Sequence, residues 1–444
     1  MVRLNSMEGL KMTAEVRWPD SLWAAVTPPG PDLPELRGTE VADVVVIGGG
    51  FSGLSTALHL REAGFDVAVV EAAEPGWGAS GRNNGQVIPT LSRPDPEDII
   101  AKHGAAGERL VGLIRDSASI LFEVARRHGI DAEQERSGWV QPVHSPGRIK
   151  IAERRVRQWS RVGAPVEMLS CEQVRDMLGS DAWYGGFWNR TGGHINPLAL
   201  ARGLARAVLA QGGRIFARSP AISIERRGDR WIVRTAQGEI SGRALVVASN
   251  AYTGEFAKTL APAIASEVMP VRSWQMATQP LSDNVRKSMI PGRQAMSDTH
   301  GELIFGRFDA RNRFVTGGAI IRPFNQIATL KARVGRRLQS LWPQIGEVRF
   351  DYVWNGLIGM TTDYLPHIHR LGPNAYGWTG CNGRGVALSI ALGDELSKAV
   401  RGVPDDELAL PFTEPTPIPA NELLRPFAPL MMVLYRHRDS KEIA

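Results

Sequence analysis

The fold of this chain is decided by the stretch Val44-Val45-Val46-Ile47-Gly48-Gly49-Gly50-Phe51-Ser52-Gly53. An apolar, β-branched run leads into the spacing G-x-G-x-x-G, and Glu71 follows eighteen residues after the last glycine. In a βαβ unit these glycines make a tight turn, admit a phosphate close to the backbone, and let the helix pack on the strand. The helix start then presents N–H groups and its positive dipole end to an anion. The stretch therefore predicts a dinucleotide site in which Glu71 accepts hydrogen bonds from a ribose.

Two other interpretations of this stretch are weaker. A glycine-rich packing turn would not require a second apolar strand, Val67 to Val70, that ends at an acid. A membrane span needs about 20 residues, whereas the uncharged segment 44–60 is shorter and contains four glycines. Residues 1–40 are polar and proline-rich, without the apolar core of a secretory leader. We therefore expect a cytoplasmic protein that begins with an extended N-terminal arm.

Composition narrows the class of protein further. A chain of 444 residues is long enough for two or three domains around a large core. Only Cys171 and Cys381 are present, which excludes a disulfide framework and argues against a metal cluster, so no metal is expected. The formal charge of +6 suits anionic cofactors, acidic substrates or an anionic membrane surface. The basic residues are scattered among carboxylates, which predicts solvated faces and no nucleic-acid module.

Later segments extend the nucleotide-type architecture. Asn196 followed by a proline starts a predicted helix that ends near Gly212, and residues 214–247 alternate like antiparallel strands. Residues 325–341 form an amphipathic pattern, and a second glycine cluster at 380–386 precedes a helix at 387–400. A cofactor that meets residues 48, 250 and 383 must be long and threaded through the fold. This favours FAD over a nicotinamide cofactor.

Five stretches carry a family resemblance: 48–71, 78–86 (Gly-Ala-Ser-Gly-Arg-Asn-Asn-Gly-Gln), 247–253 (Val-Ala-Ser-Asn-Ala-Tyr-Thr), 359–366 (Gly-Met-Thr-Thr-Asp-Tyr-Leu-Pro) and 382–386 (Asn-Gly-Arg-Gly-Val). In this order they resemble the FAD-dependent D-amino-acid-oxidase-like (glycine/sarcosine oxidase) superfamily. The branch is similar to gamma-glutamylputrescine oxidase and L-pipecolate oxidase. The resemblance covers residues 20–435. One departure is Asn84, where the branch has glycine; asparagine tolerates positive φ, so the turn can persist.

The resemblance implies an α/β protein with a discontinuous Rossmann-like FAD-binding domain and an antiparallel-sheet substrate domain. The expected division is as follows: arm, 1–40; FAD-binding domain, 41–95, 186–262 and 350–402; substrate domain, 96–185 and 263–349; C-terminal tail, 403–444. Some relatives attach the flavin through Cys or His, but neither residue type occurs in 76–86 or 353–366, and Cys381 lies in a different motif. Non-covalent FAD is therefore expected.

The resemblance also assigns the cofactor-binding residues, which are Gly48, Gly50, Phe51, Ser52, Gly53, Glu71, Ser80, Arg82, Asn83, Asn84, Gln86, Ala221, Asn250, Gly380, Gly383, Arg384, Gly385 and Val386. The glycines of the first stretch would meet the pyrophosphate, and the backbone of Ala221 would meet the adenine. Arg82, Asn83 and Gln86 would line the path to the flavin. Main-chain groups of residues 383–386 would reach the pyrimidine ring, where a helix N-terminus stabilises the anionic reduced flavin.

Four residues are expected in the catalytic region, because C–N oxidation needs an aromatic cavity with few polar anchors. Arg272 and Arg307 are cations on apolar strands; each either serves the substrate or flavin or forms a structural ion pair. We expect Arg272 to assist oxygen reduction. Trp274 lines the cavity or belongs to the core. His194 faces the flavin or serves a helix cap. His367 and His369 are expected as strand residues near the cofactor rather than acid–base groups.

These observations predict a flavoprotein that oxidises a primary or secondary amine, or an amino acid, and passes electrons to O2. One rival is a membrane-associated amino-acid dehydrogenase that reduces quinone, because the segment 425–438 is apolar with basic flanks and could contact a membrane. Packing of that segment against the fold is the alternative. A rival from another class is a non-catalytic nucleotide-binding protein.

Overall fold

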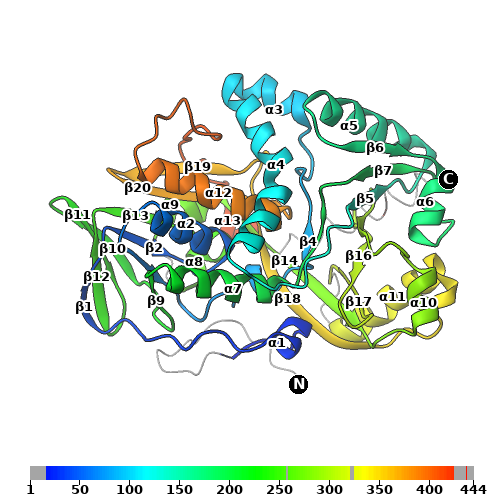
Figure 1. The fold of residues 1–444 in the computed structure, drawn as a ribbon, viewed down its shortest axis with the longest axis horizontal. Helices are drawn as coiled ribbons and strands as arrows, with labels where there is room; N and C mark the ends of the chain where they lie inside the picture. Colours follow the sequence, from blue (N-terminus) through cyan, green and yellow to red (C-terminus); the bar gives the residue numbers. More distant parts are fainter. Residues whose placement is uncertain (1–16, 257–258, 321–324, 425–436, 438–444) are drawn as a thin grey trace.

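The computed structural model describes residues 17–256, 259–320, 325–424 and 437. Two sheet regions lie side by side, with helices across their outer faces (Figure 1). The C-terminal segment 425–438, expected to contact a membrane, lies outside the described residues apart from residue 437. In the described part of the chain, no helix has the length and apolarity to cross a bilayer.

The first region is a six-stranded sheet with the order β19-β20-β13-β2-β3-β9. Its strands are β2 Val44–Ile47, β3 Val67–Val70, β9 Arg214–Phe216, β13 Ala244–Val247, β19 His367–Gly372 and β20 Ala375–Thr379. All neighbours are parallel except β19 and β20. The predicted βαβ unit therefore forms the centre of this sheet. A parallel sheet covered on both faces explains why β2, β3 and β13 are buried at every position.

The strands between 214 and 247 correct one expectation. Only β10 Ser223–Arg227, β11 Arg230–Arg234 and β12 Gly238–Gly242 pair antiparallel; they form a separate four-stranded sheet with β1 Gly38–Val41. The outer two strands of the range, β9 and β13, join the parallel sheet instead. Alternation in sequence predicts a strand but not the direction of its neighbour.

Helices cover the parallel sheet. They are α2 Phe51–Glu62, α3 Pro96–His103, α4 Ala105–Arg127, α7 Pro197–Ala210 and α12 Gly385–Val400, and all five contribute residues to one large apolar core that includes the sheet. The helices predicted to start after Asn196 and at 387 are confirmed within two residues. A Cβ added to Gly53 would lie 2.0 Å from the Gly48 carbonyl oxygen, so the third glycine permits the close helix–strand contact that the motif predicts.

The second region is an eight-stranded sheet with the order β18-β14-β17-β16-β15-β5-β7-β6. Its strands are β5 Trp139–Pro142, β6 Val166–Leu169, β7 Gly186–Asn189, β14 Met269–Thr278, β15 Ala295–Ser297, β16 Phe305–Phe308, β17 Phe314–Gly318 and β18 Phe350–Met360. All neighbours are antiparallel except β5 and β15. The antiparallel substrate-type sheet expected from the family resemblance is thus present. Its edge strand β18 and its inner strand β7 lie in residue ranges that were expected in the FAD-binding domain.

The remaining elements connect these regions. The other helices are α1 Leu22–Val26, α5 Ile149–Arg161, α6 Cys171–Leu178, α8 Thr253–Phe256, α9 Pro262–Glu267, α10 Asp283–Ser288, α11 Gln326–Leu341 and α13 Asn421–Leu424, and β4 Gln86–Val87 pairs with β8 Gly193–His194. The amphipathic helix predicted at 325–341 is α11.

The N-terminal arm holds a short helix that proline content did not predict. Ser21 caps α1, and Trp23 within it is fully buried, with its indole N–H donating to the Asn83 carbonyl at 2.9 Å. The arm is therefore pinned against the loop that follows β3.

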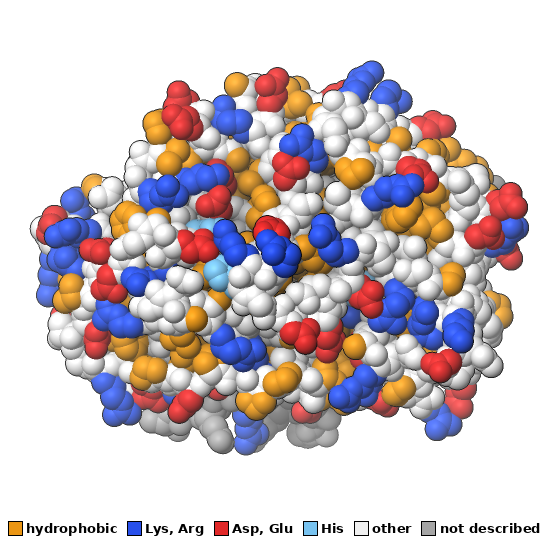
Figure 2. Space-filling model, in the orientation of Figure 1, with side chains coloured by type: hydrophobic (Ala, Val, Ile, Leu, Met, Phe, Trp, Pro, Cys, Tyr) orange, Lys and Arg blue, Asp and Glu red, His pale blue; other side chains and the backbone are white. Residues whose placement is uncertain are grey.

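The surface carries mixed charge. Figure 2 shows Lys and Arg side chains interspersed with Asp and Glu across the face viewed, without a single basic block there. Many of these charges form exposed pairs, such as Arg126 with Glu123 and Arg349 with Glu347. This is the solvated pattern that the sequence predicts.

Candidate functional site

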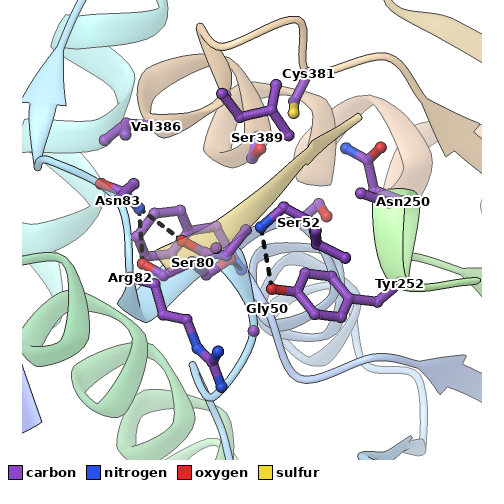
Figure 3. A pocket seen from close by; sticks show the side chains of 18 of the residues that line it. Gly50, Ser52, Ser80, Arg82, Asn83, Asn250, Tyr252, Cys381, Val386 and Ser389 are labelled. Carbon is purple, nitrogen blue, oxygen red and sulfur yellow. Dashed lines mark hydrogen bonds between the residues drawn. The ribbon is translucent and has the colours of Figure 1, made fainter. Parts of the chain in front are cut away.

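One cavity of about 370 Å³ joins the two sheet regions. Its lining comes from the β2–α2 turn, the 76–88 loop, residues 248–253, strands β14 to β16 and β18, and the start of α12. Figure 3 shows side chains from four of these segments, among them Ser80, Asn250, Tyr252 and Ser389, around this space. We call the part at Gly48–Gly50, Glu71 and Ala221 the glycine end. The part formed by Ser273, Gln275, Ser297, Leu303 and Phe305 is the sheet end.

The glycine end is built from backbone. Gly48 has a φ of +110°, which favours glycine, and Gly50 is the N-cap of α2 with no side-chain cap. Ser80 approaches from the opposite loop, where its Oγ accepts from the Phe51 N–H at 2.9 Å. The start of a twelve-residue helix thus faces the cavity with its positive dipole end. This arrangement suits an anionic group.

Glu71 closes this end. Its carboxylate accepts from the Gly49 N–H at 2.5 Å and from the Ala73 N–H at 2.8 Å. Burial raises the pKa of Glu71, and these backbone donors oppose that shift. Each carboxylate oxygen has further acceptor capacity toward the cavity. The side chain is therefore placed for the ribose contact that the sequence predicts.

The 76–86 loop forms one wall. The Arg82 Nε–H donates to the Trp77 carbonyl at 2.5 Å, and the guanidinium lies 4.1 Å from the centre of the Trp77 ring. The Asn83 amide donates to the Ser80 carbonyl at 2.8 Å, a bond also drawn in Figure 3. Arg82 and Asn83 therefore rigidify the loop while lining the cavity.

Asn84, the departure from the family pattern, does not need glycine. Within this loop the positive φ of +84° belongs to Gly85, and Asn84 is absent from the residues with positive φ. Its side chain instead bonds across the cavity wall: Nδ2 donates to Gln275 Oε1 at 3.3 Å and to the Val315 carbonyl at 3.2 Å, while Oδ1 accepts from Gln86 at 3.1 Å. Asn84 thus connects the loop to the eight-stranded sheet.

The start of α12 forms the opposite wall. Arg384 is the N-cap of this sixteen-residue helix and makes no side-chain cap bond; Gly383, Gly385, Val386 and Ser389 line the cavity beside it. A second positive helix end therefore faces the same space as α2. Burial raises the pKa of the neighbouring Cys381 thiol, which keeps it protonated and unreactive near neutral pH.

The side chains of the sheet end are uncharged, and its polar members Ser273, Gln275 and Ser297 were not predicted from sequence. Ser273 and Gln275 are two residues apart on β14, so they share one face of the strand and both line the cavity. Ser297 and Phe305 contribute from β15 and β16. Successive side chains of a strand point to opposite faces, but only the position of the cavity shows which face lines it.

The structure places the four expected catalytic residues away from the cavity lining. Arg272 and Trp274 lie on the other face of β14 from Ser273; Arg272 is exposed and Trp274 packs against the core beneath α11. Arg307 is buried and donates to the carbonyls of Asn84, Phe308 and Ile195. Burial lowers its pKa to about 10. The structure therefore gives Arg307 a backbone-anchoring position, which differs from the structural ion pair considered from sequence because its partners are carbonyl oxygens.

His194 lies in β8, buried, with its Nε2–H donating to the Arg293 carbonyl at 3.0 Å. Burial and the nearby Arg307 hold its pKa well below the usual range, so it is neutral. The catalytic roles of Arg272, Arg307, Trp274 and His194 stay predictions. Of the expected cofactor residues, all line the cavity except Gly53 and Gly380, which lie behind its wall.

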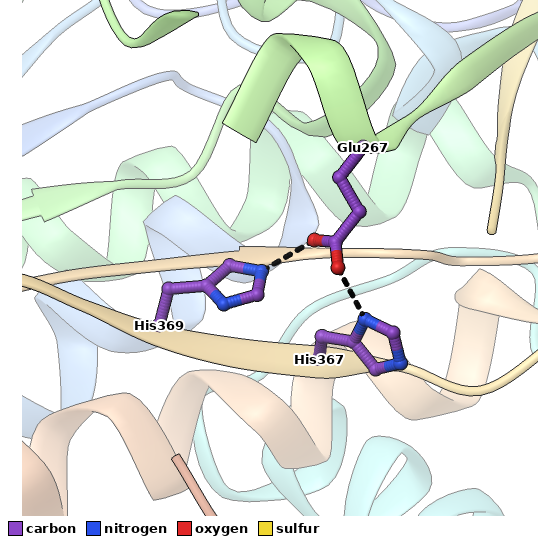
Figure 4. A group of neighbouring side chains, drawn as sticks. All are labelled: Glu267, His367 and His369. Carbon is purple, nitrogen blue, oxygen red and sulfur yellow. Dashed lines mark hydrogen bonds and ion pairs between the residues drawn. The ribbon is translucent and has the colours of Figure 1, made fainter. Parts of the chain in front are cut away.

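His367 and His369 are strand residues on β19, as predicted, and they flank one carboxylate (Figure 4). Glu267 at the end of α9 contacts His367 Nδ1 at 2.8 Å and His369 Nε2 at 2.5 Å. Asp363 contacts His367 Nε2 at 3.0 Å. Glu267, His367 and His369 have the donor types of a metal site, but every ring nitrogen of the two histidines already has a hydrogen-bond partner. We interpret the cluster as ion pairs that fasten β19 to α9.

Charge in this cluster is set by competing effects. Burial acts to lower the pKa of His367, but its bonds to Asp363 and Glu267 outweigh burial and raise the pKa to about 9. Burial likewise acts to raise the pKa of Glu267, and the two histidines lower it to about 2. His367 and Glu267 therefore form a charged pair at neutral pH.

Comparison with known proteins agrees with this geometry. The family model described as DAO, FAD dependent oxidoreductase, matches residues 43–399. Gamma-glutamylputrescine oxidoreductase of Escherichia coli K12 is 33% identical over 400 residues, 89% of this chain and 92% of that protein. Glycine oxidase of Bacillus licheniformis is 25% identical, covering 82% and 94%.

Solved structures show the same fold. Glycine oxidase from Geobacillus kaustophilus superposes with a TM-score of 0.68 at 19% identity, covering 82% of this chain and 95% of that one. Iminodiacetate oxidase from Chelativorans sp. BNC1 gives a TM-score of 0.67 at 16% identity, covering 84% and 98%.

The cavity fits an FAD molecule. FAD carries a pyrophosphate in its middle and an electron-rich pyrimidine ring at one end, and two helix N-termini face this space at separate places. A Cβ at Gly49 or Gly50 would lie 3.0 or 2.9 Å from a cavity-wall oxygen, so these glycines keep the cradle open. Glu71 and the Ala221 backbone are available at the glycine end.

Proposed function

This chain belongs to the DAO family of FAD-dependent oxidoreductases, and we propose that it oxidises the C–N bond of a primary or secondary amine, or of an amino acid, to an imine. One observation carries the proposal. The cavity that fits FAD continues into a sheet end lined by neutral and apolar side chains, with no carboxylate, histidine or lysine among its described lining residues. Such a space suits an uncharged amine held close to the cofactor.

The chemistry divides between cofactor and protein. When bound, FAD supplies a two-electron acceptor for the hydride on the carbon next to nitrogen. The protein has to orient the substrate and exclude water. Phe305 and Leu303 supply apolar surface, and Ser273 and Gln275 supply hydrogen bonds, with the Gln275 amide donating to Ser273 Oγ at 3.1 Å. The amine must enter unprotonated, because its lone pair forms the new C=N bond as the C–H bond breaks.

Water then hydrolyses the imine to an aldehyde or ketone and a free amine. We propose O2 as the electron acceptor, which yields H2O2, and non-covalent attachment of FAD in a cytoplasmic enzyme. The Cys381 thiol, whose pKa is raised by burial, is held as a neutral group that does not favour a flavin link. Substrates related to gamma-glutamylputrescine, or imino and amino acids, follow from the names of the relatives.

An anaerobic bleaching screen tests this function. The purified yellow holoenzyme is mixed without oxygen with polyamine conjugates, cyclic imino acids and N-methylated amino acids, and absorbance near 450 nm is followed. We expect at least one class to bleach the flavin, and air to restore the colour with formation of H2O2. Protein that stays yellow with every amine would contradict the proposal and favour a non-catalytic nucleotide-binding role.

The same measurement separates the acceptors. Slow recovery in air combined with fast recovery on addition of a quinone analogue would contradict the O2 assignment. That result would identify a dehydrogenase that passes electrons to quinone.

A further inference from the structure

Gln86 presents a buried oxygen atom that accepts no hydrogen bond. The side chain is 7% exposed and lines the cavity. Within the described part of the chain, its Oε1 has no donor within hydrogen-bond distance. A buried acceptor is costly unless it is bonded, and nearly all such atoms in folded proteins have a partner. This oxygen is therefore available to an N–H or O–H group of a bound molecule.

The orientation of the Gln86 amide is fixed by its neighbours. Its Nε2 donates to the Met296 carbonyl at 3.0 Å and to Asn84 Oδ1 at 3.1 Å, so both amide hydrogens are used. Asn84 is oriented in turn, because its own Nδ2 donates to the Val315 carbonyl at 3.2 Å. Exchanging the nitrogen and oxygen of Gln86 would place its oxygen against two acceptors. Oε1 is therefore the atom left without a partner.

The same hydrogen bonds continue along the cavity wall in one direction. Asn84 Nδ2 also donates to Gln275 Oε1 at 3.3 Å, and Gln275 Nε2 donates to Ser273 Oγ at 3.1 Å. The Ser273 hydroxyl thus accepts from Gln275 and keeps its own hydrogen to donate. Of this chain of side chains, Gln86 is the acceptor end and Ser273 is the donor end. An N–H group of a ligand fits at Gln86.

Gln86 lies where the cofactor part of the cavity meets the sheet end. It begins β4 directly after the 76–85 loop, most of which lines the cavity. Its partner Met296 lies on β15, next to Ser297 of the sheet end. The side chain therefore spans the border between the two parts, which is where a substrate beside the reactive edge of the flavin has to lie.

The charge of the surroundings matches an uncharged amine. Among the described lining residues the charged side chains are Glu71, Arg82 and Arg384, and Glu71 is at the glycine end, bonded to backbone N–H groups. A carboxylate beside the amine would favour the ammonium form. The amide oxygen of Gln86 carries no net charge, so it accepts from a neutral N–H without imposing protonation. This suits a reaction that needs the lone pair of the nitrogen.

We propose that Gln86 binds the substrate, with Oε1 accepting an N–H of the uncharged amine, so that the enzyme takes primary and secondary amines and rejects tertiary ones. This inference rests on the proposed function and sharpens its substrate class. A primary or secondary amine keeps at least one N–H as the free base, whereas a tertiary amine keeps none. The bond holds the N–H toward the wall and leaves the lone pair free to form the C=N bond. Gln86 is thus assigned to the substrate, whereas the family resemblance gives it to the cofactor.

A ligand titration tests the inference without turnover. Holoenzyme is titrated with aniline and with toluene, which has a methyl group in place of the amine, and the change in the flavin spectrum gives each Kd. Both probes are uncharged at neutral pH, and aniline has no hydrogen on the carbon next to nitrogen, so it cannot form an imine. We expect the wild type to bind aniline about tenfold more tightly than toluene. Gln86→Met should bring the two Kd values close together by weakening aniline binding.

Two further variants separate this role from the loss of a buried amide. Gln158 on α5 is 5% exposed, lies outside the described cavity lining, and donates to Glu97 Oε2 at 2.8 Å. Gln158→Met therefore removes a buried amide elsewhere and should keep the wild-type preference for aniline. Gln86→Asn keeps the amide but withdraws it by one methylene, and its preference should lie between those of the wild type and Gln86→Met.

Several results would overturn the inference. Equal affinity of the wild type for aniline and toluene would do so, as would a wild-type preference in Gln86→Met. Altered FAD content or an altered flavin spectrum in ligand-free Gln86→Met, with the preference intact, would assign the oxygen to the cofactor. If Gln86→Met does not fold, a wild-type preference in Gln86→Asn would contradict the assignment.

The substrate class has its own test. For any amine that bleaches the flavin, the N-methyl and N,N-dimethyl forms are compared, and equal rates of bleaching would overturn the exclusion of tertiary amines. Selective aniline binding through Gln86 in an enzyme that oxidises no amine would leave the binding role standing while the proposed function fails. Amine oxidation without that selectivity would have the reverse meaning.

Discussion

The two ends of the cavity are built in different ways. The glycine end comes largely from backbone within one short segment, where the positive φ of Gly48 and the close contact of Gly53 with the Gly48 carbonyl do not suit another residue. The sheet end comes from single side chains on or beside strands, spread from residue 273 to residue 305 along the sequence. The residues at the glycine end therefore occur at a fixed spacing in the sequence, whereas the residues at the sheet end do not. The following predictions test whether this division holds.

The largest effect should come from Gly53→Ala. The added Cβ would lie 2.0 Å from the Gly48 carbonyl oxygen, so α2 must move off β2. We expect a loss of more than about 3 kcal/mol in the free energy of unfolding, measured by urea denaturation. Gly112→Ala in α4 is the control, since its Cβ meets no atom within 4 Å; it should stabilise the protein by up to about 1 kcal/mol. Wild-type stability of Gly53→Ala would contradict the packing role.

Gly50→Val should separate cofactor binding from folding. Its Cβ first meets the flexible Ser80 hydroxyl, at 2.9 Å, so the fold can accommodate it, but the branched side chain fills the cradle at the start of α2. We expect a folded protein that loses FAD at least a hundredfold more readily than the wild type, measured by flavin content after gel filtration. Normal flavin content would count heavily against the glycine end as the pyrophosphate site.

The Glu267–His367–His369 cluster lies outside both ends and should act on stability alone. Because the folded-state pKa of His367 is raised from 6.5 to about 9, its contribution is complete below pH 6.5 and is lost as pH rises through 9. The loss should be roughly 2–3 kcal/mol, seen as a falling Tm between pH 7 and 10. His367→Gln should remove this part of the pH dependence; an identical pH profile would refute the assignment.

The smallest effect should come from Asn84→Gly, which restores the residue usual in the resembling branch. The backbone does not require glycine here, and the side-chain bonds to Gln275, Val315 and Gln86 are lost. We expect a loss of about 1–2 kcal/mol in stability and unchanged FAD content, by thermal unfolding and absorbance. Increased stability would show that Asn84 destabilises the fold and does not stabilise it by linking the loop to the sheet.

Sequence alone predicted the elements that glycine spacing or periodicity determines: the βαβ unit, α7, α11 and α12. It misjudged the partners of β9 and β13, because a strand's sequence does not encode the direction of its neighbour. It selected Arg272 and Trp274 on β14 and missed Ser273 and Gln275, which occupy the opposite face. A shift by one residue reverses the face, and only tertiary contacts settle which face meets the cavity.

The central claim is that one extended FAD spans both ends of this cavity, with its reactive edge toward the sheet end. A crystal structure of the protein grown with FAD tests it most directly. We predict density for a single FAD with its ribose at Glu71, its pyrophosphate at the start of α2 and its pyrimidine ring at the start of α12. Density for NAD alone, or for a flavin ring remote from α12, would contradict the account.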